Sequence, residues 1–222
     1  MKSKMKIVFF GDSVTEGCFG LYPTSYGFDT YREPEKGYVA KTEARLKALY
    51  GEDTVEVINA GVSGNSATKG WERIETDVLA HHPDIVFVCF GLNDVFGTLD
   101  RYKNVMSKIF DTLSANKIRP VLLTPNRMCS YLGPGVLPCA EKMAHTAVQF
   151  QNEGKMDEFV EAAKELAAAR VIPVCHAYAR SNEMEKAAID TTNRNKKAIN
   201  HPNEEMHDLF ADMVTETLQS LL

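Results

Sequence analysis

The chain has 222 residues, of which 44% are hydrophobic, and its formal net charge at pH 7 is −5. The length and apolar content favour a single domain over residues 1–222 with one substantial core. Acidic and basic residues are interspersed, and no apolar segment reaches the roughly 20 residues of a membrane-spanning helix, so neither a nucleic-acid-binding nor a membrane-bound protein is indicated.

The N-terminus and the cysteines predict a cytoplasmic protein. The apolar run at residues 5–10 is interrupted by Lys6, is too short for a signal peptide, and is followed by no small-residue cleavage site. The five cysteines are an odd number without C-x-x-C spacing, so we expect reduced thiols rather than disulfides or a zinc site. They are Cys18, Cys89, Cys129, Cys139 and Cys175.

Apolar runs of strand length alternate with amphipathic helical patterns along the chain. The runs are continuous, as in strands that are buried on both faces of a sheet. Strands that alternate with helices predict a parallel sheet covered by helices, and such sheets bind ligands at the carboxyl ends of their strands. The predicted strands are residues 5–10, 55–60, 84–91, 119–125 and 171–178, and the clearest helical patterns are 102–117, 156–170 and 203–222.

Two long stretches, residues 19–37 and 126–142, fit neither pattern. Both are rich in glycine, proline and aromatic residues. Loops of this length are usually functional or disordered. Their tyrosines favour ordered walls around a site; these are Tyr22, Tyr26, Tyr31 and Tyr131.

Four short polar segments contain the candidate chemistry. Three directly follow predicted strands, and the fourth follows the last strand and its loop. Each alone is compatible with an ordinary turn or helix cap. Together they offer what acyl transfer requires, namely a nucleophile, a base and donors for the developing oxyanion. The segments are GDSVTEG (11–17), NAGVSGNSA (59–67), GLNDVFG (91–97) and INHPNEEMH (199–207).

Each of these segments supplies one candidate residue. Ser13 can act as the nucleophile and His201 as the base. The backbone N–H groups of Ser13 and Gly64 and the side-chain amide of Asn93 can be the oxyanion donors. A glycine at position 64 lets the backbone approach a ligand without a Cβ in the way. Pro202 favours an extended His201 just before the last helix.

The four segments resemble the signature blocks of the SGNH hydrolases, the GDSL-type lipase and esterase family. The match lies in Ser13, Gly64, Asn93 and His201, whose order and spacing cover essentially the whole chain. The resemblance implies a flavodoxin-like three-layer α/β/α sandwich with a five-stranded parallel sheet. It also implies hydrolysis of ester or occasionally thioester bonds through an acyl-serine intermediate, without a metal or other cofactor.

One position departs from the family pattern. The family usually places an aspartate three residues before the histidine, to orient the imidazole, and this chain has Ala198 there. We favour a Ser–His dyad in which a main-chain carbonyl fixes the imidazole. The alternative is an acid from elsewhere, and Asp190 is the nearest upstream candidate. We expect Asp12 and Asp94 to order their loops rather than to act in catalysis.

The first hypothesis is a serine esterase that removes a small acyl group, expected to be acetyl, from a carbohydrate or similar polar alcohol. The tyrosine-rich loops suit stacking on sugar rings better than lining a fatty-acid channel. One alternative is a lysophospholipase or thioesterase of the same family. Another is a non-catalytic carbohydrate-binding module on this scaffold, which the alanine at position 198 would suit. A nucleotide-binding protein is disfavoured because no phosphate-loop motif is present.

Overall fold

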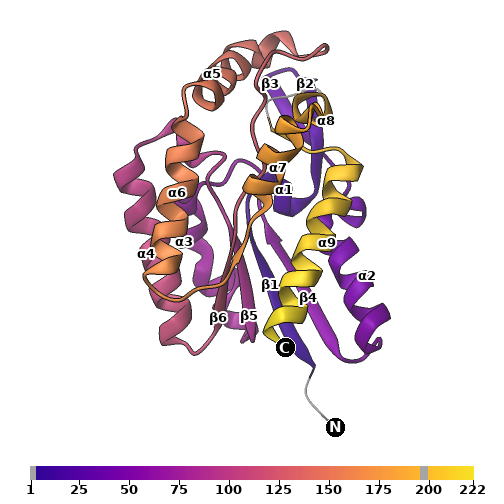
Figure 1. Cartoon of the computed structure of the whole chain (residues 1–222), viewed down its shortest axis with the longest axis vertical. Coiled ribbons are helices and arrows are strands. Elements are labelled where there is room, and N and C mark those ends of the chain that lie inside the picture. Colours follow the sequence, from indigo (N-terminus) through magenta and orange to yellow (C-terminus); the bar gives the residue numbers. More distant parts are fainter. Residues whose placement is uncertain (1–3, 196–199) are drawn as a thin grey trace.

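The protein is built around a five-stranded parallel sheet, seen here in a computed structural model that describes residues 4–195 and 200–222 (Figure 1). The strand order is β4-β1-β5-β6-β7. Numbered among themselves, these strands run 2-1-3-4-5, the order of flavodoxin-like sheets. The predicted parallel α/β fold is therefore confirmed. The strands are β1 (Met5–Gly11), β4 (Val55–Gly61), β5 (Ile85–Cys89), β6 (Arg119–Leu123) and β7 (Val174–Cys175).

The core is centred on β1, which pairs with β4 on one side and β5 on the other. Phe9 lies opposite Asn59 and Phe87 in these ladders, and the rings of Phe9 and Phe87 stack with their centroids 5.0 Å apart. Residues 7–10 are completely buried. A strand that is covered on both faces needs apolar side chains at consecutive positions, which explains the continuous apolar run at the N-terminus.

Helices cover both faces of the sheet. Helices α2 and α9 pack together on one face, and α3, α4 and α6 cover the other (Figure 1). Helix α9 begins where the sequence predicts, because the Asn203 side chain accepts a hydrogen bond from the Met206 N–H at 3.0 Å. The helices are α1 (Ser13–Glu16), α2 (Tyr38–Tyr50), α3 (Ala67–Asp77), α4 (Leu99–Ala115), α5 (Glu141–Asn152), α6 (Lys155–Ala168), α7 (Ala177–Lys186), α8 (Thr191–Arg194) and α9 (Glu204–Leu221), with 3₁₀ turns η1 (Pro34–Lys36), η2 (Leu79–His81), η3 (Asp94–Phe96) and η4 (Pro138–Ala140).

Residues 19–37 are more regular than the sequence predicts. Most of this stretch is an antiparallel hairpin of β2 (Cys18–Thr24) and β3 (Gly27–Arg32). Leu21 and Thr30 pair across it and are buried, whereas Tyr22 and Asp29 pair at exposed positions. A proline inside β2 and the short run of alternation hide this hairpin in the sequence. The stretch is ordered, as its tyrosines led us to expect, but most of it is a hairpin rather than an irregular loop.

The fifth strand is shorter than predicted. Residues 171–178 contribute only the two-residue β7 to the sheet, and α7 already begins at Ala177. Val171 has a positive φ of 57°, and the N–H of Ile172 still bonds to the carbonyl of Ala167. The chain is therefore still leaving α6 at these residues, and its bonding to β6 begins at the Pro173 carbonyl, which accepts from the Leu122 N–H at 2.9 Å.

All five cysteines are free, and Cys139 is the exposed one. Within residues 4–195 and 200–222, the helices are too short or too polar to cross a lipid bilayer.

Candidate active site

Ser13 lies at the carboxyl end of β1, where the chain turns from the strand into the short helix α1. The side chain of Asp12 caps this helix by accepting a hydrogen bond from the Val14 N–H at 3.0 Å. Gly17 ends the helix in a left-handed conformation, with a φ of 95°. The opening motif therefore forms a tight strand–turn–helix unit that holds the Ser13 side chain at the sheet edge.

The structure brings His201 to Ser13 across 188 positions of the sequence. The His201 Nε2 lies 2.9 Å from the Ser13 Oγ, and both residues are only 5% exposed. A neutral imidazole at this distance can accept the hydroxyl proton, which is the geometry that a nucleophile and its base require. The sequence placed these two residues in the same site, and their side chains are in hydrogen-bond contact.

The segment that contains His201 is fixed through its main chain. Pro202 forms an isolated antiparallel bridge with Asn195. The buried side chain of Asn126, which follows β6, donates a hydrogen bond from Nδ2 to the carbonyl of Asn200 at 2.9 Å. These contacts lie on both sides of His201 and hold its backbone at the rim of the sheet.

Burial lowers the pKa of His201 from 6.5 to about 4, because the charged imidazolium loses its solvation. The ring is thus neutral at pH 7. When Nε2 accepts from Ser13, the proton of the neutral ring is on Nδ1. This buried Nδ1 has no hydrogen-bond partner among the residues that the structure describes.

Two positions were considered for the acid that would orient the imidazole. Ala198, which stands at the usual position of the acid, lies outside the described residues. Asp190 is engaged elsewhere, because it caps α8 through the Asn193 N–H at 2.9 Å and accepts a hydrogen bond from the Tyr131 hydroxyl. Asp190 is therefore occupied by contacts other than His201.

The two candidate oxyanion segments contact each other. The Asn93 Nδ2 donates to the carbonyl of Asn65 at 2.9 Å, which joins the segment after β5 to the loop after β4. Because an amide group has two N–H bonds, one remains for a ligand. Gly64 has a φ of 73°, and a Cβ at this position would meet no atom within 4 Å. A glycine suits this position because the backbone is in the left-handed conformation, and the space beside it is open.

Asp12 and Asp94 each bond the backbone of the segment around them, as expected from the sequence. Asp94 is buried and accepts from the Ala67 N–H with both carboxylate oxygens, at 2.9 and 3.2 Å. Burial raises the pKa of Asp94 to about 6 and that of Asp12 to about 7. The Asp12 Oδ2 has no partner within residues 4–195 and 200–222. Asp12 is thus a buried carboxyl beside the candidate nucleophile.

Three further side chains hold the site together, and sequence reasoning missed them. Arg73 of α3 donates to the carbonyls of Gly11 and Ala60 at 2.8 Å each, so it ties the ends of β1 and β4. Glu16 accepts from the Ser63 N–H at 2.7 Å. Asn126 is the third. Glu16 stands inside the GDSVTEG motif, which could have drawn attention to it, whereas no local pattern marks Arg73 or Asn126.

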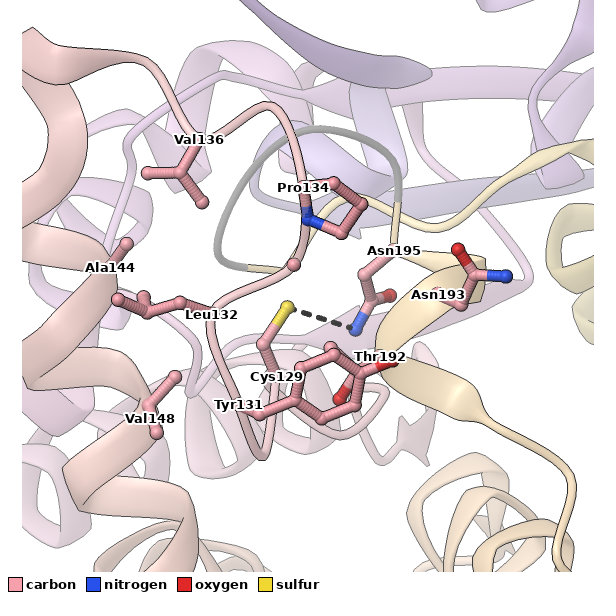
Figure 2. A pocket seen from close by; sticks show the side chains of 11 residues that line it. Cys129, Tyr131, Leu132, Pro134, Val136, Ala144, Val148, Thr192, Asn193 and Asn195 are labelled. Carbon is pink, nitrogen blue, oxygen red and sulfur yellow. Dashed lines mark hydrogen bonds between the residues drawn. The ribbon is translucent and has the colours of Figure 1, made fainter.

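A small cavity of about 50 Å³ lies under residues 129–136. Figure 2 shows Leu132, Val136, Ala144 and Val148 on one side of it and Thr192 and Asn195 on the other. The side chain of Asn195 donates to the Cys129 Sγ at 3.9 Å. The residues that line the cavity include none of Ser13, Gly64, Asn93 and His201. The part of the second long stretch that lines this cavity, residues 129–136, packs between α5 and α8.

A serine–histidine hydrogen bond at the carboxyl edge of a parallel sheet, with a glycine loop and an asparagine amide after the neighbouring strands, is an arrangement typical of the serine hydrolase class. The model of the GDSL-like lipase/acylhydrolase family matches residues 9–209. The chain belongs to this family, a class of carboxylic ester hydrolases.

Individual relatives support the same assignment. The chain is 38% identical over 95 residues to an acetylxylan esterase from Geobacillus stearothermophilus. It is 24% identical over 127 residues to the uncharacterised lipoprotein YqeF of Bacillus subtilis. The matched segments span 43% and 53% of this chain and only 42% and 47% of those relatives, less than half of their length.

Solved structures are similar over nearly the entire chain. A crystal structure of an acetyl xylan esterase, AlAXEase, superposes with a TM-score of 0.72 at 21% identity, covering 98% of this chain and 100% of that one. A catalytic variant of an acetylxylan esterase from Geobacillus stearothermophilus gives a TM-score of 0.73 at 24% identity, covering 98% and 95%. At these identities the similarity establishes the fold.

Proposed function

We propose that this protein is a serine esterase that removes small acyl groups, with acetyl as the preferred one, from a carbohydrate or similar polar alcohol. The observation that carries the proposal is the 2.9 Å contact between the Ser13 Oγ and the His201 Nε2. Membership of an acylhydrolase family supports the reaction type. The similarity to acetylxylan esterases supports the acyl group and the alcohol.

In the proposed reaction, His201 takes the proton of Ser13 as its Oγ attacks the ester carbonyl. The tetrahedral oxyanion accepts hydrogen bonds from the N–H groups of Ser13 and Gly64 and from the amide of Asn93. The protonated imidazole then gives its proton to the departing alcohol, which leaves an acyl-serine. Water, activated by His201 in the same way, releases the acid and restores the hydroxyl.

Exposed aromatic side chains support a sugar-like alcohol. Tyr22 and Tyr31 stand at exposed positions on the β2–β3 hairpin. This hairpin is joined to the loop that contains Gly64, because the Thr30 hydroxyl donates to the Ser63 hydroxyl at 3.1 Å. Flat aromatic rings next to a polar site suit stacking on sugar rings better than holding a long acyl chain. The cytoplasmic location stays a prediction.

The test compares p-nitrophenyl acetate with p-nitrophenyl octanoate, and wild type with Ser13→Ala. We expect a higher kcat/KM for the acetyl ester, acetate release from acetylated xylo-oligosaccharides, and a loss of at least about 10⁴-fold in kcat for Ser13→Ala. A preference for octanoate would favour the lysophospholipase or thioesterase alternative. Equal inactivity of both proteins with intact glycan binding would favour the carbohydrate-binding module.

A further inference from the structure

The carboxylate of Glu16 connects three parts of the candidate site. Glu16 is the last residue of α1, three positions after Ser13. Its Oε2 accepts from the backbone N–H of Ser63 at 2.7 Å, and its Oε1 accepts from the Arg32 Nε at 3.0 Å. One side chain therefore joins the serine turn, the loop after β4 and the β2–β3 hairpin.

The backbones that Glu16 joins are already in close contact. A Cβ on Gly61, at the end of β4, would lie 2.1 Å from the Glu16 backbone nitrogen, so only glycine allows this approach. The loop then begins with a bond from the Val62 N–H to the Gly11 carbonyl at 3.2 Å. At Ser63 the N–H has the carboxylate as its acceptor, and a hydrogen bond to a charged group is about twice as strong as a neutral one.

Gly64 lies between two fixed points. On one side Glu16 holds the N–H of Ser63, and on the other the Asn93 amide holds the carbonyl of Asn65 at 2.9 Å. The peptide unit between residues 63 and 64 is planar, so its orientation sets the direction of the Gly64 N–H. Gly64 itself has a φ of 73°, and a bond from the Asn65 N–H to the Val62 carbonyl at 3.1 Å closes the turn that contains it. Releasing either fixed point would let this turn shift as a unit.

We propose that Glu16 is a positioning residue, which holds residues 62–65 so that the Gly64 N–H stays directed at the oxyanion formed at Ser13. This inference rests on the proposed function, because it requires Gly64 as an oxyanion donor. Glu16 does not touch the reacting atoms and acts through the main chain of Ser63.

The hairpin supports this arrangement from the outer side. Arg32 also donates to the carbonyl of Thr30 at 2.9 Å and to the Asp29 carboxylate at 3.2 Å, and the Thr30 hydroxyl reaches the Ser63 hydroxyl. The side chains of Arg32 and Glu16 are 37% and 27% exposed, so solvent screens their ion pair and its share of stability is small. The Cys18 thiol is a further donor to Glu16, at 3.6 Å. The loss of the carboxylate should thus disturb geometry more than folding.

The experiment measures kcat and KM on p-nitrophenyl acetate and the Tm of three variants at position 16. Glu16→Ala removes the acceptor, and Glu16→Asp withdraws the carboxylate by one methylene group. Both should lower kcat by about 10- to 100-fold with KM within about twofold, because small displacements of a donor are costly in the transition state. Glu16→Gln keeps an oxygen that can accept from the Ser63 N–H and should recover most of the kcat.

Two further measurements separate positioning from a structural role. The rate at which a fluorophosphonate labels Ser13 should fall by the same factor as kcat in Glu16→Ala, because its phosphoryl oxygen uses the same donors. Glu43→Ala is the matched control, since Glu43 is 33% exposed and is paired with Lys47 on α2, and this variant should keep the wild-type kcat.

A wild-type kcat in Glu16→Ala and Glu16→Asp would overturn the inference, as would a loss of kcat that follows a lowered Tm and is not recovered by Glu16→Gln. If Glu16→Ala fails to fold, Glu16→Asp decides. The proposed function fails separately, if Ser13→Ala retains activity. An inactive Ser13→Ala beside a fully active Glu16→Asp would reject only the role of Glu16.

Discussion

The nucleophile side and the base side of the candidate site are held in different ways. On the nucleophile side, hydrogen bonds from side chains are dense: Asp12 caps the serine turn, Glu16 holds Ser63, and Asn93 holds Asn65. On the base side, the ring of His201 makes one hydrogen bond among the described residues, to Ser13, and its backbone is fixed through neighbouring residues.

The two sides are held differently because their residues come from different parts of the fold. Ser13, Gly64 and Asn93 each lie just after a strand of one parallel sheet, so the sheet register already places them at one edge. His201 stands between β7 and α9 and does not directly follow a strand, so contacts from other segments must hold it at the serine. The oxyanion side should therefore be sensitive to loss of the side chains that bond its loops, and the base side to loss of the contacts that hold the backbone around His201.

Among the substitutions that test this comparison of the two sides, Asn93→Ala is expected to have the largest effect. The amide joins the two oxyanion segments and provides one proposed donor, so its removal should lower kcat on p-nitrophenyl acetate by about 10²- to 10³-fold with a small change in Tm. Steady-state kinetics and thermal unfolding measured by circular dichroism check this. An unchanged kcat would remove Asn93 from the oxyanion role and would make the two sides of the site less different than we infer.

A smaller effect is expected for Asn126→Ala. This change leaves the buried carbonyl of Asn200 without its donor, which should cost about 1–3 kcal/mol in the free energy of unfolding and lower kcat about 10-fold. The matched control is Asn116→Ala, because Asn116 makes the same kind of bond, to the Thr112 carbonyl at 2.9 Å, at an exposed position. If Asn126→Ala loses stability while its kcat matches that of the control, the backbone of His201 is held by other contacts.

The smallest effect concerns Asp12, and it depends on pH. The folded pKa of Asp12 is about 7, above its ordinary value of 3.8, so between these values the folded protein binds a proton that the unfolded chain has lost. Its contribution to stability is therefore present at low pH and is lost as pH rises toward 7. Asp12→Asn keeps an acceptor for the Val14 N–H and removes this titration.

Urea denaturation at pH 5 and pH 8 measures the Asp12 effect. The free energy of unfolding of Asp12→Asn, relative to wild type, should be higher at pH 8 than at pH 5. A relative stability that does not change with pH would mean that Asp12 is not a buried carboxyl with a raised pKa, and Asp94 would then be the group of this kind on the nucleophile side.

Two elements differ from their predictions because the sequence contains only a weak pattern for them. The β2–β3 hairpin was missed because Tyr22, Tyr31 and Phe28 are all partly exposed, so its strands lack the continuous apolar run of a buried strand. The last strand is shorter than predicted, since Val171 and Ile172 complete the exit from α6 instead of pairing in the sheet. Apolar content shows that a segment is buried but not which element buries it.

The supporting residues were missed for a different reason. Glu16 and Ser63 are 47 positions apart, and Asn126 and Asn200 are 74 apart. Each bond joins a side chain to a backbone group, and almost any residue offers the same backbone N–H or carbonyl. A single sequence contains no local pattern for such a contact.

The sequence by itself determined the parallel α/β architecture and the set of four candidate residues, because buried strands require continuous apolar runs and acyl transfer requires particular side chains at strand ends. Only the tertiary structure decided that His201 meets Ser13 at 2.9 Å and that Glu16, Arg73 and Asn126 hold the segments around them. Chemistry depends on residue type, which the sequence states directly. Position depends on packing between distant segments, which exists only once the chain has folded.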